Sequence, residues 1–186
     1  MLSILRKEIN TFLNSLIAYI VIVLFLTGMG LFMWVFPETS ILEYGFAEMD
    51  TLFSLAPFVF MFLIPAITMR TFAEEKKDGT IELLLTRPVT DWQIILGKYL
   101  SSVLLVCLAL LPTLLYYYSV SSLGSPAGNV DSAGVAGSYI GLVLLGSTFA
   151  SIGILSSVIT VNQIVSFIIA VFICFIFYSG IESMDT

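Results

Sequence analysis

Long apolar tracts without a charged residue alternate with short charged clusters along this chain of 186 residues. A helix needs about 20 residues to cross the hydrocarbon core of a bilayer. The last charge-free tract, residues 132–181, is long enough for two crossings, and its only strongly polar point near the centre is residues 160–163. The pattern therefore predicts five membrane-spanning helices, at about residues 12–35, 52–72, 98–119, 138–160 and 163–181.

The composition agrees with burial in lipid. Hydrophobic residues make up 59% of the chain and charged residues 11%, with a mean hydropathy of +1.06. In a soluble domain about a quarter of the residues are charged, because a polar surface must cover the core. We therefore predict an all-α membrane protein, a single transmembrane domain over residues 1–186 built as a helical bundle of about five transmembrane helices.

The remaining charges are sorted by sign between the two sides of the predicted bundle. The segments before the first span and between the second and third hold all seven basic residues: Arg6, Lys7, Arg70, Lys76, Lys77, Arg87 and Lys98. The opposite side holds acidic residues only. Because basic residues accumulate on the cytoplasmic side of membrane proteins, we expect a cytoplasmic N-terminus. The cytoplasmic segments carry nearly as many acidic as basic residues, so no nucleic acid partner is expected.

The first residues carry an amphipathic pattern. Leu2, Leu5 and Ile9 recur at helical spacing, while Arg6 and Lys7 lie off that stripe. Such a helix suits the inner membrane surface, so we predict an N-terminal interfacial helix before the first span. The alternative is a helix that continues straight into that span.

The stretch between the second and third spans, residues 70–98, contains several helix stops and starts. Gly79 suits a helix C-terminus, and Thr80 suits the N-cap of a short helix over residues 81–86. Pro88 ends that helix, because a proline disfavours the α conformation of the residue before it. Thr90 and Gln93 form a predicted capping box for the third span, in which Lys98 is expected to extend its ammonium to the lipid headgroups.

The short helix carries four apolar side chains on the cytoplasmic side, Ile81, Leu83, Leu84 and Leu85. Burying each of them would be worth about 1.5–3 kcal/mol. We predict that this helix docks in a groove of another protein. The alternative is that its side chains pack against the protein's own helices or lie among the lipid headgroups.

The sequence offers little catalytic chemistry. It has no histidine, its two cysteines fall inside predicted spans, and no carboxylate lies within a span. Ion-coupled carriers usually place ionisable residues there. The chain also lacks the G-x-x-x-x-G-K-[ST] loop that holds nucleotide phosphates. We therefore expect no catalytic residues, no cofactor and no metal, and the energy for any active transport has to come from a separate polypeptide.

Residues 70–86, R-T-F-A-E-E-K-K-D-G-T-I-E-L-L-L-T, resemble ABC-2 type transporter permeases, as do residues 88–92 (P-V-T-D-W) and 96–98 (L-G-K). The T-V-N-Q turn at residues 160–163 is a second, weaker match. The nearest subgroup is the gliding-motility-associated (GldF-like) one, and the resemblance extends over nearly the whole chain. It implies a multi-pass permease of the bacterial inner (cytoplasmic) membrane that is not itself an enzyme.

In this family a permease pairs with a second permease, and two ATPase subunits bind below them. The resemblance therefore implies an ABC ATPase partner that binds ATP, and either a second permease subunit or a homodimer. It also implies a cytoplasmic coupling helix between spans two and three. The docking residues carried over are Glu74, Glu75, Lys76, Gly79, Thr80, Ile81, Glu82, Leu83, Leu84 and Leu85.

Permeases of this family usually have six spans, so a chain with five is expected to be truncated or completed by another segment. Two rival functions remain. One is a non-transporting membrane scaffold of a motility or envelope complex. The other, which the scarcity of charge in the spans disfavours, is a secondary transporter.

Overall fold

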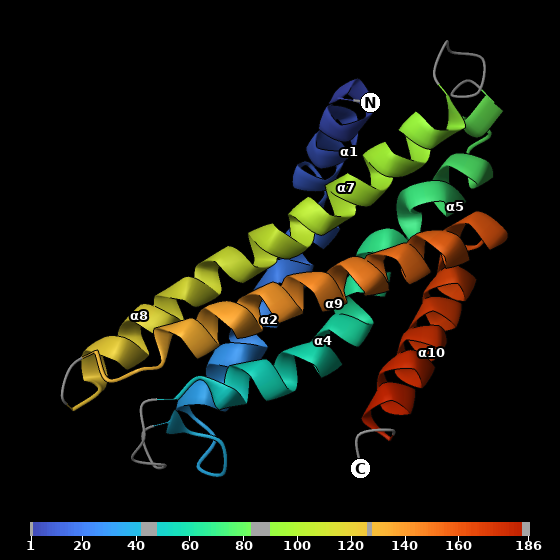
Figure 1. Cartoon of the computed structure of the whole chain (residues 1–186). Coiled ribbons are helices and arrows are strands. Elements are labelled where there is room, and N and C mark those ends of the chain that lie inside the picture. Colours follow the sequence, from blue (N-terminus) through green and yellow to red (C-terminus); the bar gives the residue numbers. More distant parts are fainter. Residues whose placement is uncertain (1, 42–47, 83–89, 126–127, 184–186) are drawn as a thin grey trace.

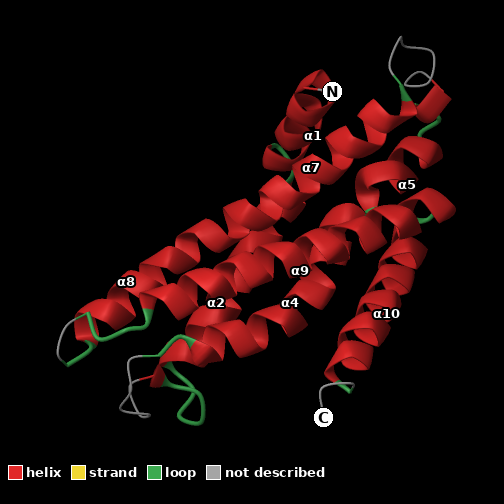
Figure 2. Ribbon diagram, in the orientation of Figure 1, coloured by secondary structure: helices red, strands yellow, loops and turns green. Residues whose placement is uncertain are grey.

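The computed structural model describes residues 2–41, 48–82, 90–125 and 128–183. All regular structure in these ranges is helical, as Figures 1 and 2 show. The elements are α1 (Leu2–Leu13), α2 (Leu16–Trp34), α4 (Asp50–Thr68), α5 (Arg70–Lys77), α7 (Asp91–Leu110), the 3-10 turn η1 (Leu111–Thr113), α8 (Leu114–Leu123), α9 (Ser132–Ile159) and α10 (Gln163–Glu182).

Five helical segments in the described part of the chain are long and apolar enough to cross a membrane, which confirms the predicted all-α membrane bundle. They are Leu16–Trp34, Asp50–Lys77, Asp91–Leu123, Ser132–Ile159 and Gln163–Ile181. Several of them extend beyond the predicted spans because polar residues cap them outside the apolar tract. The fourth begins at Ser132, where the Asp131 carboxylate accepts hydrogen bonds from the N–H groups of Ala133 and Gly134, both at 3.1 Å.

Two of the spans are interrupted next to a proline. α4 ends at Thr68, three residues after Pro65, and the helix resumes as α5 at Arg70. Pro112 lies in η1, between α7 and α8. Proline removes a helical hydrogen bond and clashes with the preceding turn, so the helix bends or changes type there. At both points the backbone stays in the α region, and the Met69 N–H still donates to the Pro65 carbonyl at 2.8 Å, so the interruptions are short.

The N-terminal segment forms a separate helix, as the interfacial-helix interpretation predicted. α1 leaves α2 at Asn14 and Ser15 and packs beside the first turns of α7 (Figure 1). Ile4 is buried in this contact, and a Cβ atom at Gly97 would lie 3.0 Å from Ile4 Cγ2. Glycine at this position lets the two helices approach closely, so one side of α1 is covered by the protein itself.

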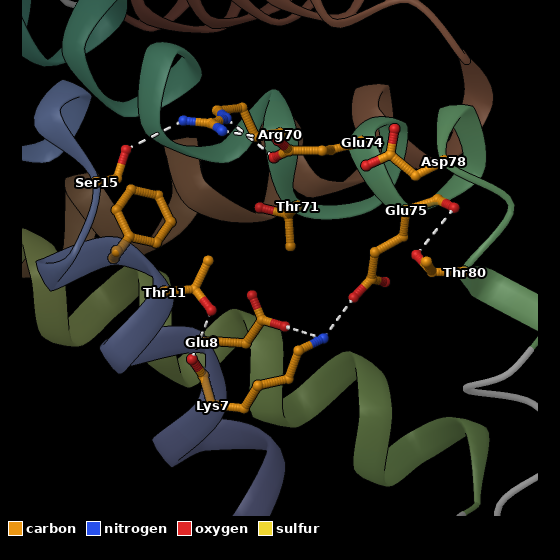
Figure 3. Close-up of a pocket in the computed structure, with 11 residues that line it drawn as sticks. Lys7, Glu8, Thr11, Ser15, Arg70, Thr71, Glu74, Glu75, Asp78 and Thr80 are labelled. Atoms are coloured by element: carbon orange, nitrogen blue, oxygen red, sulfur yellow. Dashed lines mark hydrogen bonds and ion pairs between the residues drawn. The ribbon is translucent and has the colours of Figure 1, made fainter.

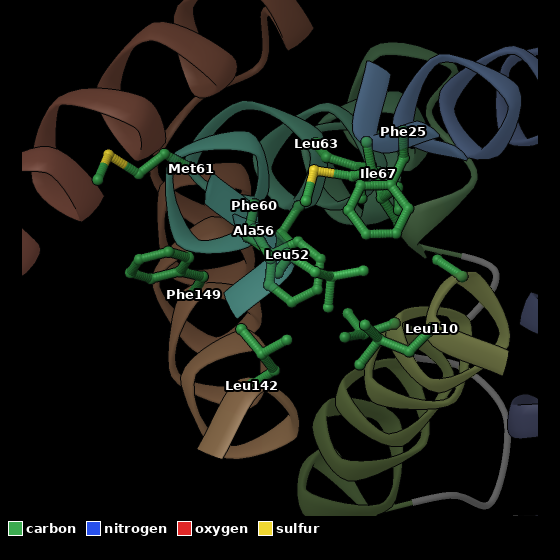
Figure 4. Close-up of a cluster of buried hydrophobic side chains, with 14 of the residues drawn as sticks. Phe25, Leu52, Ala56, Phe60, Met61, Leu63, Ile67, Leu110, Leu142 and Phe149 are labelled. Carbon is green, nitrogen blue, oxygen red and sulfur yellow. The ribbon is translucent and has the colours of Figure 1, made fainter. Parts of the chain in front are cut away.

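The core of the bundle lies between α4 and α9, with side chains from α2 and α7 completing it (Figure 4). Phe25, Phe60, Ile64, Val106 and Phe149 are almost fully buried there. The outer helices are much less covered. Only 22% of the apolar window of α2 and 17% of that of α10 is buried, against 56% for the α4–α5 span. Their outward faces are therefore free to contact lipid or another subunit.

Glycines in α9 set how closely this helix approaches α4 and α7. A Cβ atom at Gly146 would lie 2.7 Å from Val106 Cγ1, and one at Gly153 would overlap the side chain of Thr68. Thr68 is buried, and its hydroxyl donates to the Ile64 carbonyl at 2.9 Å, so it has little freedom to turn away. Small residues allow the close backbone contact on which helices in lipid depend.

We expect Gly153→Ala to lower the unfolding free energy by about 1–3 kcal/mol, because the added methyl overpacks the α4–α9 contact. The matched control is Gly141→Ala in the same helix, where a Cβ atom meets nothing within 4 Å. That control should be neutral or slightly stabilising, since alanine is the better helix former. Thermal unfolding in detergent compares the two, and equal effects would contradict the close contact at Gly153.

Candidate functional site

Oppositely charged side chains meet at the end of the bundle where α1, α5 and α7 come together. At its centre the Lys98 ammonium lies 3.0 Å from Glu8 Oε1 on α1 and 3.0 Å from Glu75 Oε2 on α5. It also donates to the Thr71 carbonyl at 2.7 Å. Glu8 and the Thr71 carbonyl accept hydrogen bonds from this ammonium, while Glu75 Oε2 contributes through its charge. We call Lys7, Glu8, Glu75 and Lys98 the charge cluster.

Lys98 is only 1% exposed, so the expectation that it reaches the lipid headgroups is wrong. Its position on the second turn of α7 directs it between α1 and α5, and its ammonium lies 4.8 Å from the centre of the Phe72 ring. A buried lysine is costly unless it is paired and hydrogen-bonded. The two carboxylates satisfy that requirement, and the aromatic face adds a cation–π contact.

Lys7 makes the cluster electrically neutral. Its ammonium lies 2.9 Å from Glu75 Oε1 and 3.7 Å from Glu8 Oε1, so two lysines face two glutamates. Partial burial lowers the pKa of Lys7, but the hydrogen bond and charge of Glu75, followed by those of Glu8, outweigh it and raise the pKa above its usual value. The cluster therefore connects α1 to α5 twice, through the buried Lys98 and through the exposed Lys7.

A single hydroxyl joins the break between α4 and α5 to α9. Ser157 Oγ accepts hydrogen bonds from the N–H groups of Phe72 and Ala73, at 2.9 and 3.0 Å, and donates to the Met69 carbonyl at 3.0 Å. These N–H groups lie in the first turn of α5, where a helix offers them no partner of its own. Ser157, which lies on another helix, therefore supplies the hydrogen-bond acceptor that these two N–H groups lack within the interrupted span.

The far end of α5 is also attached to α9. Lys76 donates a hydrogen bond to the Val158 carbonyl in the last turn of α9, where a cation suits the helix dipole. The turn that follows, residues 160–163, begins α10 at the Asn162 cap, whose side chain accepts from the Ile164 N–H at 3.0 Å. The second patch of family resemblance thus lies next to α5, although it is far away in sequence.

The C-terminus of α5 has the turn that the sequence indicates. Gly79 has a positive φ of 68°, which glycine adopts at low cost. Its N–H donates to the Lys76 carbonyl at 3.3 Å, and the Thr80 N–H donates to the Glu75 carbonyl at 3.0 Å. This pair of bonds is the Schellman motif, which ends a helix and redirects the chain. The Gly79 turn therefore directs the chain from α5 into residues 81–86.

The other residues expected to dock an ATPase have different surroundings. Glu74 pairs with Arg70 at 2.7 Å on the same helix, and Glu82 is exposed. Ile81 packs against a small cluster of buried side chains that includes Phe72 and Ile154, so it contacts the protein's own helices, as the alternative interpretation proposed. The predicted contact residues Leu83, Leu84 and Leu85 lie outside the described residues.

The third span begins at Thr90, which has the extended backbone of an N-cap residue. Its N–H donates to Gln93 Oε1 at 3.4 Å, and the Gln93 N–H donates to the Thr90 carbonyl at 2.9 Å. Asp91 in the first turn suits the positive end of the helix dipole. The start of α7 is therefore well defined, and the position of Lys98 two turns later follows from it.

Sequence reasoning missed Glu8 and Ser157. The available signal was Lys98 itself, because a lysine that is buried within a membrane bundle pairs with an acidic residue, and Glu8 is the acidic residue that precedes all the spans. No local pattern distinguishes Ser157 from the other small residues of α9, since its role depends on a break in another helix.

A comparison of the sequence with models of protein families gives a match. The model of the ABC-2 family transporter protein matches residues 2–184, nearly the whole chain. The chain belongs to the ABC-2 transporter family. It is thus the membrane-embedded permease subunit of an ABC transporter, a family in which ATP is hydrolysed by a partner subunit. Searches of curated proteins and of solved structures give no significant match.

Replacing Lys98 should strongly destabilise this ABC-2 permease. We expect Lys98→Met to lower the unfolding free energy by about 3–5 kcal/mol, because it leaves buried carboxylates without their counter-charge. In a double-mutant cycle, Glu8→Gln should cost much less in the Lys98→Met background than in the wild type. Lys77→Met, at an exposed residue of α5, is the control. Additive effects of Lys98→Met and Glu8→Gln would contradict the pairing.

Ser157→Ala should lower the unfolding free energy by about 1–3 kcal/mol, because two buried N–H groups of α5 lose their acceptor. The control is Ser151→Ala in the same helix, whose hydroxyl bonds only to the carbonyl of Thr148 and is exposed. Hydrogen exchange of the Phe72 and Ala73 amides should rise in the first variant only. Unchanged exchange there would rule out the bridge between α9 and α5.

Proposed function

We propose that this permease is driven by an ATPase subunit that docks on residues 70–98, with residues 79–86 as the coupling helix. The observation that carries the proposal is the bonding of α5 to three other helices. The chain that leaves the Gly79 turn is directly continuous with α5, and α5 is bonded to α1 and α7 through the charge cluster and to α9 through Ser157. A displacement of residues 79–86 would therefore be passed to most of the bundle.

The mechanism that this bonding supports is alternating access by rigid-body motion. ATP-driven closure of two ATPases would move the coupling helices, and α5 would carry the motion to α4 across the break at Met69. Interfaces held by specific hydrogen bonds switch between discrete arrangements and do not deform continuously. The 3-10 turn at Pro112 offers a second place where the bundle can bend without unfolding.

The charge distribution supports a cytoplasmic position for this end of the bundle. α1, α5 and the start of α7 carry basic residues, while the opposite end presents Glu48, Asp50 and Asp131 around a shared hollow. By the positive-inside tendency the N-terminus would be cytoplasmic, and the membrane would be the bacterial inner membrane. A docking segment on this side would meet ATP-binding subunits in the cytoplasm.

A second permease, either another chain or a copy of this one, would complete the transporter. The largely exposed apolar faces of α2 and α10 are the surfaces available for it. A link to gliding motility rests on the sequence resemblance of residues 70–98 alone.

The alternative function is a scaffold that binds the ATPase without moving solute. ATP hydrolysis by the reconstituted complex, measured with and without this chain, separates the two, because only a transporter couples turnover to the permease.

Leu84→Glu tests the docking proposal. The charge should abolish co-purification of the ATPase subunit, since burying an unpaired carboxylate in an apolar groove is prohibitive. Insertion into the membrane should be unchanged, because residue 84 lies outside the spans. Leu84→Met is the matched control and should retain the ATPase, since it conserves apolar volume. An ATPase that co-purifies equally with all three forms would refute docking at this segment.

A further inference from the structure

A pocket of about 140 Å³ opens between α1 and α5, beside the charge cluster (Figure 3). One water needs roughly 10–15 Å³ of such space, so the pocket has room for a group of several heavy atoms. Thr11 lines it on α1 and Thr71 lines it on α5. Asp78 and Thr80 line it at the Gly79 turn, where the proposed coupling segment begins. The pocket therefore lies next to the surface on which we expect the ATPase to dock.

Acidic side chains outnumber basic ones around this pocket. Six charged side chains line it, four acidic and two basic: Glu8, Glu74, Glu75, Asp78, Lys7 and Arg70. Lys98 pairs with Glu8 and Glu75 from α7, which brings the basic side chains to three against four acidic ones. Within the described residues the pocket is thus one positive charge short. A cation suits it and an anion does not.

The carboxylate without a counter-charge is that of Asp78. Arg70 donates to both carboxylate oxygens of Glu74, at 2.9 and 2.7 Å, and the other two carboxylates are paired within the charge cluster. Asp78 is exposed at the end of α5, and it forms no ion pair with any residue that the structure describes. The charge that the pocket lacks is therefore needed near the Gly79 turn.

A buried hydroxyl in the wall of the pocket also lacks a partner. Thr71 is 6% exposed, and its Oγ1 has no hydrogen bond to any described residue. Other helical hydroxyls of the chain, such as those of Thr68 and Ser102, donate to the carbonyl four residues earlier. Thr71 instead lies on the side of α5 that faces α1 (Figure 3). Because buried hydroxyls are almost always hydrogen-bonded, this one indicates a polar group that enters the pocket from outside.

We propose that the pocket receives a basic side chain, lysine or arginine, of the docked ATPase subunit, an inference that rests on the proposed docking at residues 70–98. Thr71 and Asp78 are seven residues apart, so they lie on one face of α5 about 10 Å from each other. A long basic side chain enters beside Asp78 and donates from its nitrogen to Thr71 Oγ1. The charge of the pocket is then balanced, and α1 becomes one wall of the docking surface.

Other cations fit less well. Among the described residues no three acidic, cysteine or histidine side chains come close enough together to hold a metal ion. An amine-bearing phospholipid headgroup also brings a phosphate, and the pocket offers it no free cation, since Glu74 holds Arg70. Arg87 of this chain lies outside the described residues, so the experiments below test it as a rival occupant.

The first test measures the Kd of the purified ATPase subunit for the full chain in nanodiscs. We expect Asp78→Asn to raise this Kd by up to about fivefold, the factor that one exposed charge pair contributes. Thr71→Val should raise it by about tenfold, because a hydrogen bond to a charged group is lost. Glu38→Gln is the charge-matched control at the opposite end of the bundle and should leave the Kd unchanged.

Thermal unfolding of the permease without the ATPase separates binding from folding. Thr71→Val removes a buried hydroxyl that has no partner, so the midpoint of unfolding should stay the same or rise. Arg87→Gln and Thr71→Val should have additive effects on this midpoint. Non-additive effects would show that Arg87 of this chain occupies the pocket, and they would overturn the proposal.

A double-mutant cycle across the interface identifies the occupant. Each lysine and arginine of the ATPase is replaced by alanine, in complexes with the wild-type chain and with Thr71→Val. One replacement should weaken binding much less in the Thr71→Val complex than in the wild-type complex, because the two residues act as a pair. The same replacement should also be coupled to Asp78→Asn. If every replacement is additive with Thr71→Val, no basic side chain enters the pocket and the proposal is wrong.

Leu84→Glu distinguishes a failure of this proposal from a failure of the coupling segment. If Leu84→Glu abolishes ATPase binding while Thr71→Val and Asp78→Asn leave the Kd unchanged, docking at residues 79–86 stands and the pocket proposal fails. If Leu84→Glu has no effect while the pocket variants weaken binding and the cycle shows coupling, the pocket proposal stands and the coupling segment does not.

Discussion

The packing of α1, α5 and α7 in this ABC-2 permease depends on the burial of one lysine. Lys98 has almost no contact with solvent, and its charge is tolerable only because Glu8 and Glu75 reach it from two other helices. Neither carboxylate is on α7, so the pairing fixes α1 and α5 against it. Removing either partner leaves an uncompensated charge in a poorly solvated place. The three helices are therefore held together by charge pairing as well as by apolar contacts.

Side-chain hydrogen bonds lie at both interruptions of the spans. A helix broken near proline loses hydrogen bonds that a membrane cannot replace, so a neighbouring helix has to supply them. At the α4–α5 break Ser157 does so from α9. Near Pro112 the Thr113 hydroxyl bonds to the Leu110 carbonyl at 2.6 Å and shares a hydrogen bond of 2.9 Å with Tyr139. α9 thus contacts both breaks, through the backbone groups that Ser157 bonds at the first and through the Thr113 hydroxyl that Tyr139 bonds at the second.

Much of the fold could be predicted from the sequence because each helix that crosses a lipid bilayer needs a sufficiently long apolar tract. Charge-free tracts of sufficient length predict the five spans, and the T-V-N-Q turn correctly divides the last tract. The ends of the helices could not be predicted in the same way. Asp131 caps α9 outside the apolar tract, and hydropathy carries no signal for caps.

The site was less predictable, because its contacts are tertiary. Family resemblance drew attention to residues 70–98, and the match to the ABC-2 family confirms that level of the identification. The burial of Lys98 depends on the positions of Glu8 and Glu75 in the folded chain. The spacing of residues along the sequence does not reveal these positions. Ile81 likewise looked like a partner contact by hydropathy, yet it packs against Phe72 and its neighbours.

The central claim is that α1 and α5 form one rigid unit that carries the work of the ATPase into the bundle. The most direct measurement is the distance between spin labels at Arg6 on α1 and Lys77 on α5, both exposed, in a background without Cys107 and Cys174. In the complete complex this distance should be the same with and without ATP, while the distance from Lys77 to a label at Glu48 on the opposite end changes. An ATP-dependent change between Arg6 and Lys77 would contradict the account.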